Sequence, residues 1–146
     1  LAQEVFDELE IVALKKGIHL RFKDGANKGY MVKADRDNIR QVLVNLISNS
    51  VKYGNQGGHT KIGFYDMDSY VLVEVADNGI GIPQKHLKHI FDRFYRVDKS
   101  RSRTMGGSGL GLSIVKHIIE AHQQTINVRS GEGMGATFGF TLEKVA

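Results

Sequence analysis

The residues with the clearest chemical potential occupy positions 77–82, with the sequence Asp-Asn-Gly-Ile-Gly-Ile. They follow the apolar, β-branched run 70–76, which predicts a buried strand. Asp77 is therefore expected at the carboxyl end of that strand, where its carboxylate can accept a hydrogen bond from an amine. Gly79 and Gly81 would let the backbone approach a flat ring without a Cβ in the way. An ordinary Asn-Gly turn is the alternative, and other stretches must decide.

A second group of polar side chains lies on a helix predicted over residues 37–53. At 100° per residue, Asn45, Asn49 and Lys52 fall on one face, away from the apolar face of the same helix. Amide oxygens are hard ligands that suit Mg²⁺, and the lysine can meet a phosphate. The alternative is a solvated polar face. Asparagine is a poor choice inside a helix unless it has a role, which favours the ligand hypothesis.

The third signal is the glycine-rich run 106–112, which leads into an apolar-striped helix predicted over residues 110–122. Glycines at a helix N-terminus offer backbone N–H groups to an anion. The run is not a P-loop, because the Lys-Ser/Thr ending is missing, and no strand precedes it as in a dinucleotide-binding fingerprint. A flexible hinge is the alternative. Because Lys99, Arg101 and Arg103 precede the glycines, a mobile lid over phosphates is favoured.

Composition limits the classes of function that the chain can have. Its 146 residues suit one domain with a real core, and 41% hydrophobic with 25% charged residues is ordinary for a globular protein. The lack of cysteine excludes disulfides, a thiol nucleophile and thiolate metal sites. No apolar run approaches a membrane span, and no signal peptide is recognisable. Residues 85–103 contain seven Lys and Arg against two Asp, which suits a polyphosphate better than nucleic acid.

The elements that must position these groups alternate between helix and strand. The periodicity predicts helices over residues 3–16, 37–53, 84–91 and 110–122, and strands over residues 18–22, 30–34, 61–67, 70–76, 125–130 and 136–142. The first strand is expected to turn at Asp24-Gly25 and return as the second, and the third and fourth to form a hairpin. The expected fold is an α/β (α+β) two-layer sandwich, a mixed sheet with helices packed on one face.

Four motifs, in order and with consistent spacing, resemble those of two-component sensor histidine kinases. Residues 45–53 resemble the N box, 77–82 the G1 box, 91–96 the F box and 107–111 the G2 box. The similarity covers nearly the whole chain and implies the Bergerat ATP-binding fold, shared with gyrase, mismatch-repair and heat-shock chaperone ATPases. Residues 1–146 would then form one catalytic ATP-binding domain, with residues 98–108 as its ATP lid.

The resemblance implies how the nucleotide base is held. Asp77 would accept the adenine amino hydrogen, with help from Thr137 through a water molecule. Gly79 and Gly81 would shape the pocket floor. The resemblance also places Tyr53 and Ile82 beside the nucleotide.

The resemblance also implies ligands for the metal and the phosphates. Asn49 would ligate Mg²⁺, assisted by Asn45 from one turn away. Lys52, Arg96 and Arg101 would contact the phosphates, and Asn49, Lys52 and Arg96 would be the catalytic residues. The backbone donors of the lid and the following helix would come from Gly107, Gly109, Leu110 and Gly111.

The resemblance further implies that ATP is held rather than quickly hydrolysed. Hydrolytic relatives carry a water-activating Glu at the position of Asn45, and an amide is no base. The phosphoryl acceptor in this family is a His followed by an acid on a separate dimeric helical hairpin. The histidines of this chain, at positions 19, 59, 86, 89, 117 and 122, have no such context. We therefore expect a catalytic domain that cannot phosphorylate itself alone.

The implied partners are the protein's own dimerisation and phosphotransfer domain and, downstream, a response regulator. The implied setting is a cytoplasmic domain of an inner-membrane sensor, monomeric in isolation, with no nucleic-acid or direct membrane contact. The alternative function is an anti-sigma-type serine kinase or a degenerate ATP-binding regulatory module. The F box at residues 91–96 counts against the first, and the presence of Asp77, Asn49 and the glycines against the second.

Two departures from the family pattern are visible. Ser50 replaces a more usual small apolar residue, and residues 122–124, His-Gln-Gln, stand where glycines usually end the last helix. A residue other than glycine is thus expected to form the C-cap, at a cost of about 1 kcal/mol. Neither departure is expected to touch the nucleotide site.

Overall fold

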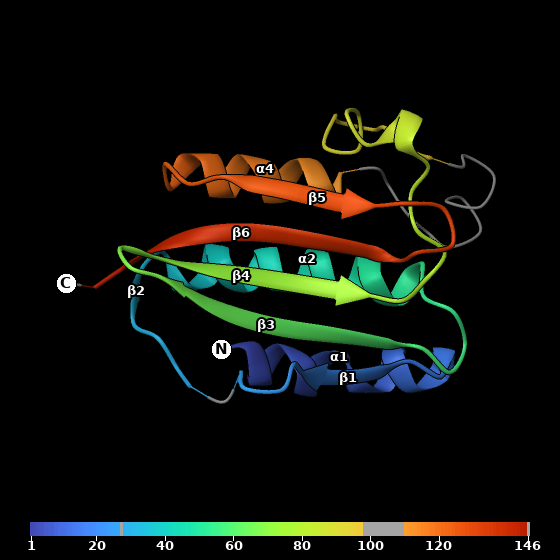
Figure 1. Ribbon diagram of the computed structural model, residues 1–146, viewed down its shortest axis with the longest axis horizontal. Helices are drawn as coiled ribbons and strands as arrows, with labels where there is room; N and C mark the ends of the chain where they lie inside the picture. The colour runs from blue at the N-terminus through green and yellow to red at the C-terminus, as the bar shows by residue number, and fades with distance from the viewer. Residues whose placement is uncertain (27, 98–109, 146) are drawn as a thin grey trace.

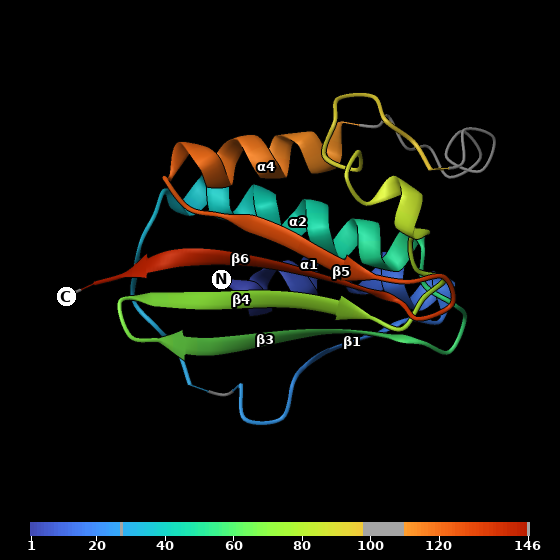
Figure 2. The same ribbon diagram turned by 45° about the horizontal axis from the view of Figure 1, so that its top comes forward.

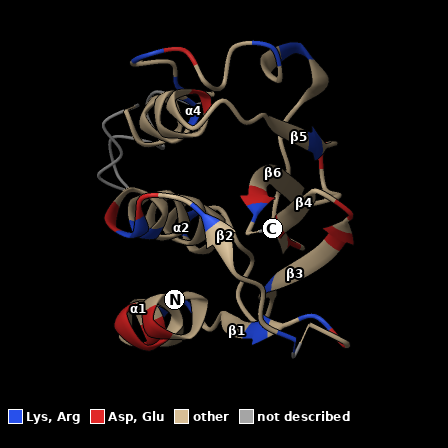
Figure 3. Cartoon of the chain, turned by 90° about the vertical axis from the view of Figure 1, so that its left-hand side faces the viewer, with Lys and Arg blue, Asp and Glu red and all other residues tan. Residues whose placement is uncertain are grey.

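A mixed β-sheet covered on one face by helices makes up the part of the chain that the structure describes, residues 1–26, 28–97 and 110–145 of a computed structural model (Figures 1 and 3). The elements in order are α1 (Ala2–Lys16), β1 (His19–Phe22), β2 (Val32–Lys33), α2 (Arg36–Lys52), β3 (His59–Met67), β4 (Tyr70–Asp77), the 3₁₀ helix η1 (Gln84–His86), α4 (Gly111–Ala121), β5 (Ile126–Ser130) and β6 (Ala136–Lys144). This is the predicted two-layer arrangement.

The sheet places β4 near its centre, in the order β1-β3-β4-β6, with β2 and β5 both pairing with β6. The predicted hairpin of β3 and β4 is confirmed, and Asp68 at its turn has a φ of 65°. Val73 and Val75 of β4 lie opposite Phe140 and Phe138 of β6, and all four side chains are buried beneath the helices. Strand β4 therefore has a paired strand on each side.

The predicted return of residues 30–34 along the first strand is wrong. β1 runs parallel to β3, whereas β2 is a two-residue strand that pairs with Glu143 and Lys144 of β6 near the far edge. Residues 23–31 can reach about 30 Å, which is enough to cross several strands spaced about 4.8 Å apart. The local alternation of side chains indicated half-burial correctly but contained no information about the partner strand.

The segment after β4 is also less helical than predicted for residues 84–91. Only Gln84–His86 form a helix, of the 3₁₀ type, and bonds of the same i→i+3 kind continue it, such as His89 N–H to the His86 carbonyl at 2.9 Å. Ile90 is buried, and the Phe91 ring meets Phe138 edge-on, with 6.1 Å between centroids. These apolar contacts fix the segment on the sheet.

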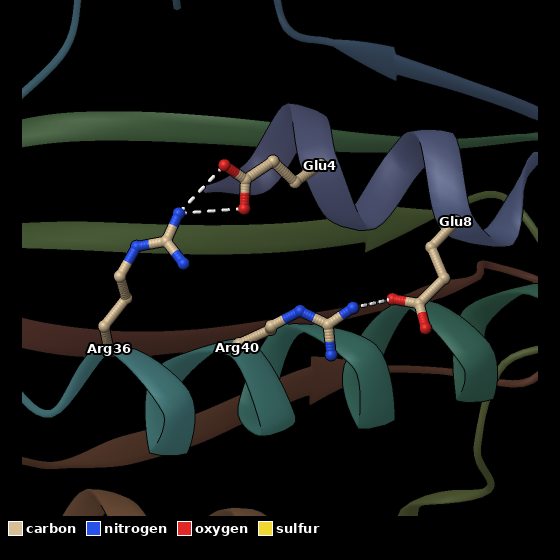
Figure 4. Close-up of polar contacts among 4 residues, drawn as sticks. All are labelled: Glu4, Glu8, Arg36 and Arg40. Atoms are coloured by element: carbon tan, nitrogen blue, oxygen red, sulfur yellow. Dashed lines mark hydrogen bonds and ion pairs between the residues drawn. The ribbon is translucent and has the colours of Figure 1, made fainter.

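Helix α1 is joined to α2 by two exposed ion pairs (Figure 4). Arg36 donates to both carboxylate oxygens of Glu4 at 2.8 Å, and Arg40 donates to Glu8. The Arg36 hydrogen bond and charge lower the pKa of Glu4. Because both pairs have the same sequence separation, the two helices run in the same direction. Exposed pairs stabilise little, so these pairs chiefly set the register of α1 on α2.

None of the helices in the described ranges is long and apolar enough to cross a membrane.

Candidate functional site

Asp77 lies at the end of β4, as predicted, with its carboxylate turned toward α2. Its Oδ1 accepts hydrogen bonds from the Gly79 N–H at 2.9 Å and the Ala136 N–H at 3.2 Å. Burial raises the pKa of Asp77, and these two N–H groups and the Ser50 hydroxyl only partly oppose the shift. A half-buried carboxylate with one oxygen already bonded to the backbone can still accept a hydrogen from a ligand amine.

A buried polar pair, Ser50 and Thr60, supports Asp77 from below. Their hydroxyl oxygens are 2.6 Å apart, and the side chains are 3% and 0% exposed. Because the Ser50 hydroxyl is close enough to Asp77 to lower the pKa of its carboxyl, the expectation that Ser50 would not touch the site is wrong. Thr60 was not predicted either. Its position directly opposite Asp77 in the β3–β4 register is the signal that could have identified it.

Gly79 and Gly81 allow neighbouring backbone segments to pack closely against the loop after β4. A Cβ on Gly79 would lie 2.4 Å from the Tyr53 carbonyl oxygen, and one on Gly81, which has a φ of 74°, would lie 1.9 Å from that of Gly131. The Ile80 N–H donates to the same Tyr53 oxygen at 3.1 Å. The glycines thus join the end of β4 to the end of α2 and to the β5–β6 turn.

Ser130 makes a further link that the sequence did not indicate. It accepts from the Ile82 N–H at 2.8 Å and donates to the Gly135 carbonyl at 2.6 Å. A Cβ on Gly135 would lie 2.1 Å from the Asp77 carbonyl oxygen. The loop after β4 and the β5–β6 turn therefore form one packed unit around Asp77.

The placement predicted for Thr137 is wrong. Phe138 and Phe140 are buried against the helices, so the alternation along β6 turns Thr137 to the opposite face of the sheet. Asp77 faces the helix side, where its Oδ1 meets the Ala136 N–H. Ala136 is therefore the β6 residue beside Asp77. Thr137, the next residue along the strand, lies on the other face of the sheet.

The polar face of α2 meets the start of α4. The Asn45 amide donates from Nδ2 to the Gly111 carbonyl at 3.1 Å, and its Oδ1 accepts from Gln41 at 2.6 Å. Asn49 is half-buried one turn further along α2. Within the described ranges its side-chain amide has no hydrogen-bond partner, which leaves its oxygen available to a cation.

Lys52 and Arg96 bring two positive charges together. Burial lowers the pKa of Lys52, and the charge of Arg96 lowers it further. Neither side chain forms an ion pair with an acidic residue in the part of the chain that is described. Two adjacent cations are unfavourable alone and favourable around an anion. This pair is the feature of the site that best fits a phosphate chain.

Three further predicted residues, Tyr53, Leu110 and Gly111, lie at the ends of helices. Tyr53 forms the C-cap of α2, and Leu110 and Gly111 begin α4. The end of β4, the last turns of α2 and the start of α4 lie toward the same end of the sheet, at the right in Figure 1. These elements and the loops beside them contain the predicted residues Asn45, Asn49, Lys52, Tyr53, Asp77, Gly79, Gly81, Ile82, Arg96, Leu110 and Gly111. Arg101, Gly107, Gly109 and the predicted lid 98–108 lie outside the described residues.

Comparison with known proteins identifies the family to which this chain belongs. Residues 34–146 match the family described as histidine kinase-, DNA gyrase B- and HSP90-like ATPase. The sensor histidine kinase WalK of Bacillus subtilis (strain 168) is 43% identical over 141 residues, covering 94% of this chain and 23% of that protein. The chain therefore spans about a quarter of this relative.

Solved structures of histidine kinases are similar to this chain in fold and sequence. The catalytic domain of histidine kinase ThkA has a TM-score of 0.82 and 34% identity, over 98% of this chain and 90% of that domain. Full-length ShkA in complex with AMPPNP has a TM-score of 0.85 and 28% identity, over 99% of this chain and 30% of that protein. The chain belongs to the histidine kinase-, DNA gyrase B- and HSP90-like ATPase family and, within it, to the catalytic domains of sensor histidine kinases.

Proposed function

We propose that this chain binds ATP with Mg²⁺ and donates the γ-phosphoryl group to a histidine on the dimerisation domain of the same protein, from which a response regulator receives it. The main support is one observation: the half-buried carboxylate of Asp77 and the Lys52–Arg96 cations lie at the end of the sheet where the loop after β4 meets the end of α2. A nucleotide needs an acceptor for its base amine and cations for its phosphates. ThkA, a relative, has been solved in complex with the response regulator TrrA.

The base is proposed to bind at Asp77. The buried pair Ser50 and Thr60 holds the carboxylate in place, so that it need not reorganise when the adenine amine arrives. Tyr53 and Ile82 flank this position on the packed loops described above. Gly79 and Gly81 contribute by allowing those loops to pack closely.

The phosphates are proposed to bind between α2 and the start of α4. Lys52 and Arg96 are close enough to influence one another and would neutralise charge on the transferring group. Leu110 and Gly111 would contribute backbone N–H groups at the N-terminus of α4. Arg101, Gly107 and Gly109 would add contacts from the proposed lid 98–108.

Asn49 is the proposed principal ligand of Mg²⁺, because its amide oxygen has no competing partner among the described residues. Asn45 could assist only if its Oδ1 exchanged the hydrogen bond from Gln41 for the metal. When bound, Mg²⁺ would neutralise phosphate charge. The role of the amide residues in this chain is to hold the ion at the end of α2.

No carboxylate stands at position 45 to activate water, so we expect bound ATP to be held rather than hydrolysed, and the proposed acceptor is a histidine on another domain. In the proposed transfer, an imidazole nitrogen of the acceptor forms the N–P bond as the bond to the β–γ bridging oxygen breaks and ADP leaves. Phe94 supports an outside partner here: its ring is 62% exposed, and its φ of 65° is strained for a side chain. We place the domain in the cytoplasm as part of a membrane sensor.

The test combines this chain with its own dimerisation domain and ATP labelled at the γ-phosphate. Label should appear on the dimerisation domain, be lost in acid and survive base, and be absent when the acceptor histidine is replaced by glutamine. The chain alone should remain unlabelled and release phosphate slowly. Acid-stable label on serine or threonine would replace this proposal with the serine-kinase alternative.

Lys52→Met should make the free chain more stable while weakening nucleotide binding. The folded-state pKa of Lys52 is lowered, so its charged form opposes folding below that pKa, and stability should rise as pH increases through the folded pKa toward the unfolded value. Methionine keeps the aliphatic stem and removes this cost together with the phosphate contact. Thermal unfolding with and without Mg-ATP measures both effects.

Lys116→Met, on the exposed surface of α4, is the matched control and should change neither quantity appreciably. A Lys52→Met chain that is stabilised by Mg-ATP as strongly as the unmodified chain would remove Lys52 from the phosphate site.

A further inference from the structure

Helix α4 lies along α2 in the opposite direction (Figure 2). A polar contact near each end joins the two helices. Near the proposed nucleotide site, Asn45 of α2 donates to the Gly111 carbonyl at the start of α4, at 3.1 Å. At the remote end, the backbone N–H of Asp35 donates to His122 Nε2, at 3.0 Å. Asp35 is the N-cap of α2, and His122 is the C-cap of α4.

The hydrogen bonds of His122 define its tautomer. Nδ1 lies 2.8 Å from the Ile118 carbonyl oxygen, which can only accept, so Nδ1 carries the hydrogen. Nε2 is then the acceptor that the Asp35 N–H requires. The ring connects the last turn of α4 to the first turn of α2, where the Asp35 carboxylate also caps the helix by accepting from Asn38 N–H at 3.0 Å.

The apolar contact between the helices does not by itself define their relative position along the axis. Val115 and Ile119 of α4 and Val42 and Leu46 of α2 are fully buried. Burial of apolar surface is non-directional and tolerates sliding better than a hydrogen bond does. The chain also ends α4 without glycine, as expected, because Gln123 adopts the left-handed conformation with a φ of 60°. At the remote end of α4, the His122 ring therefore provides the directional contact between the two helices.

We propose that His122 is a positioning residue for the nucleotide site: by holding the C-terminus of α4 on the N-cap of α2, it sets the register at which Gly111 meets Asn45. The ring acts through the helix and touches no ligand. The effect on nucleotide binding rests on the proposed function above. The effect on the position of Gly111 does not, because it is a property of the free chain.

Two substitutions separate the bond within α4 from the bond between helices. His122→Asn places an amide N–H near the position of Nδ1 and can keep the Ile118 bond, but it is too short to reach Asp35. His122→Gln places its amide near the position of Nε2 and can accept from the Asp35 N–H. The control is Thr141→Val, which removes the Thr141 hydroxyl bond to Gln124 Oε1, 2.7 Å long, at the same end of the molecule without touching α2.

Nuclear magnetic resonance of the free chain gives the first readout. A through-hydrogen-bond coupling between the Asp35 amide nitrogen and His122 Nε2 should be present in the unmodified chain. His122→Asn should shift the amide resonances of Gly111 and Leu112, at the far end of α4, whereas His122→Gln and Thr141→Val should leave them in place. An unmoved Gly111 resonance in His122→Asn, or a His122→Gln chain that behaves like His122→Asn, would overturn the proposal.

Calorimetric titration with Mg-ATP, at a temperature where each variant is fully folded, gives the second readout. We expect affinity about five- to tenfold lower in His122→Asn, as the loss of one hydrogen bond allows, and within about twofold of the unmodified chain in the other two variants. Equal losses in all three would indicate a general loss of stability and overturn positioning. If the unmodified chain binds no Mg-ATP, the proposed function fails, and the Gly111 resonance alone decides the role of His122.

Discussion

Asp77→Asn should weaken Mg-ATP binding about 100-fold while leaving the chain folded. The asparagine oxygen can take the place of Oδ1 and keep the hydrogen bonds from the Gly79 and Ala136 N–H groups. Its amide nitrogen would then present hydrogens to the adenine amine, so that two donors face one another in a half-buried site. Isothermal titration calorimetry measures the loss, and circular dichroism checks the fold.

The dependence on pH provides a second readout. Burial raises the pKa of Asp77, so its protonated form is favoured in the folded state. Asp77 therefore stabilises the fold below its unfolded-state pKa, and this stabilisation is lost as pH rises through its folded-state pKa. A ligand amine, in contrast, requires the ionised form of the carboxyl. Affinity should therefore begin to fall on acidification at a higher pH than for an ordinary aspartate, and Asp77→Asn should lack this dependence.

Asp68→Asn, in the exposed β3–β4 turn, is the matched control, because asparagine tolerates the positive φ found there. It should bind Mg-ATP like the unmodified chain. Equal affinity of Asp77→Asn and the unmodified chain would remove Asp77 from the base-binding role.

Gly135→Ala should lower the free energy of unfolding by about 3–5 kcal/mol, the combined cost of a left-handed alanine and a backbone clash. The φ of Gly135 is 74°, and its added Cβ would lie 2.1 Å from the Asp77 carbonyl oxygen and 2.9 Å from the Asn78 Cα. These are backbone atoms in a packed unit and cannot move aside as a side chain can. Urea unfolding followed by circular dichroism measures the change.

Gly133→Ala isolates the conformational part of this cost. Gly133 belongs to the same turn and has nearly the same φ, 73°, but an added Cβ would meet nothing within 4 Å. Its replacement should therefore cost only about 1–2 kcal/mol. Equal destabilisation by the two alanines would show that the contact between Gly135 and Asp77 is not tight, and would weaken the description of these loops as one packed unit.

Local features of the sequence were sufficient to predict most elements and much of the candidate site. The β-branched run 70–76 indicated a buried strand with Asp77 at its carboxyl end, and in the structure β4 ends at Asp77. The 3.6-residue period likewise placed Asn45, Asn49 and Lys52 on one face of α2. These predictions depend on steric preferences and periodicities that act over a few residues, so the chain contains them at each position.

The tertiary structure decided what depends on pairing between distant segments. The partner of β2, the Ser50–Thr60 pair beneath Asp77 and the bond from Asp35 to His122 all join residues whose proximity no local pattern contains. The pairing of distant strands determines the partner of β2, and the packing of α2 on the sheet brings Ser50 to Thr60. The packing of α4 on α2 determines the last, because only the folded helices bring the ring of His122 to the first turn of α2.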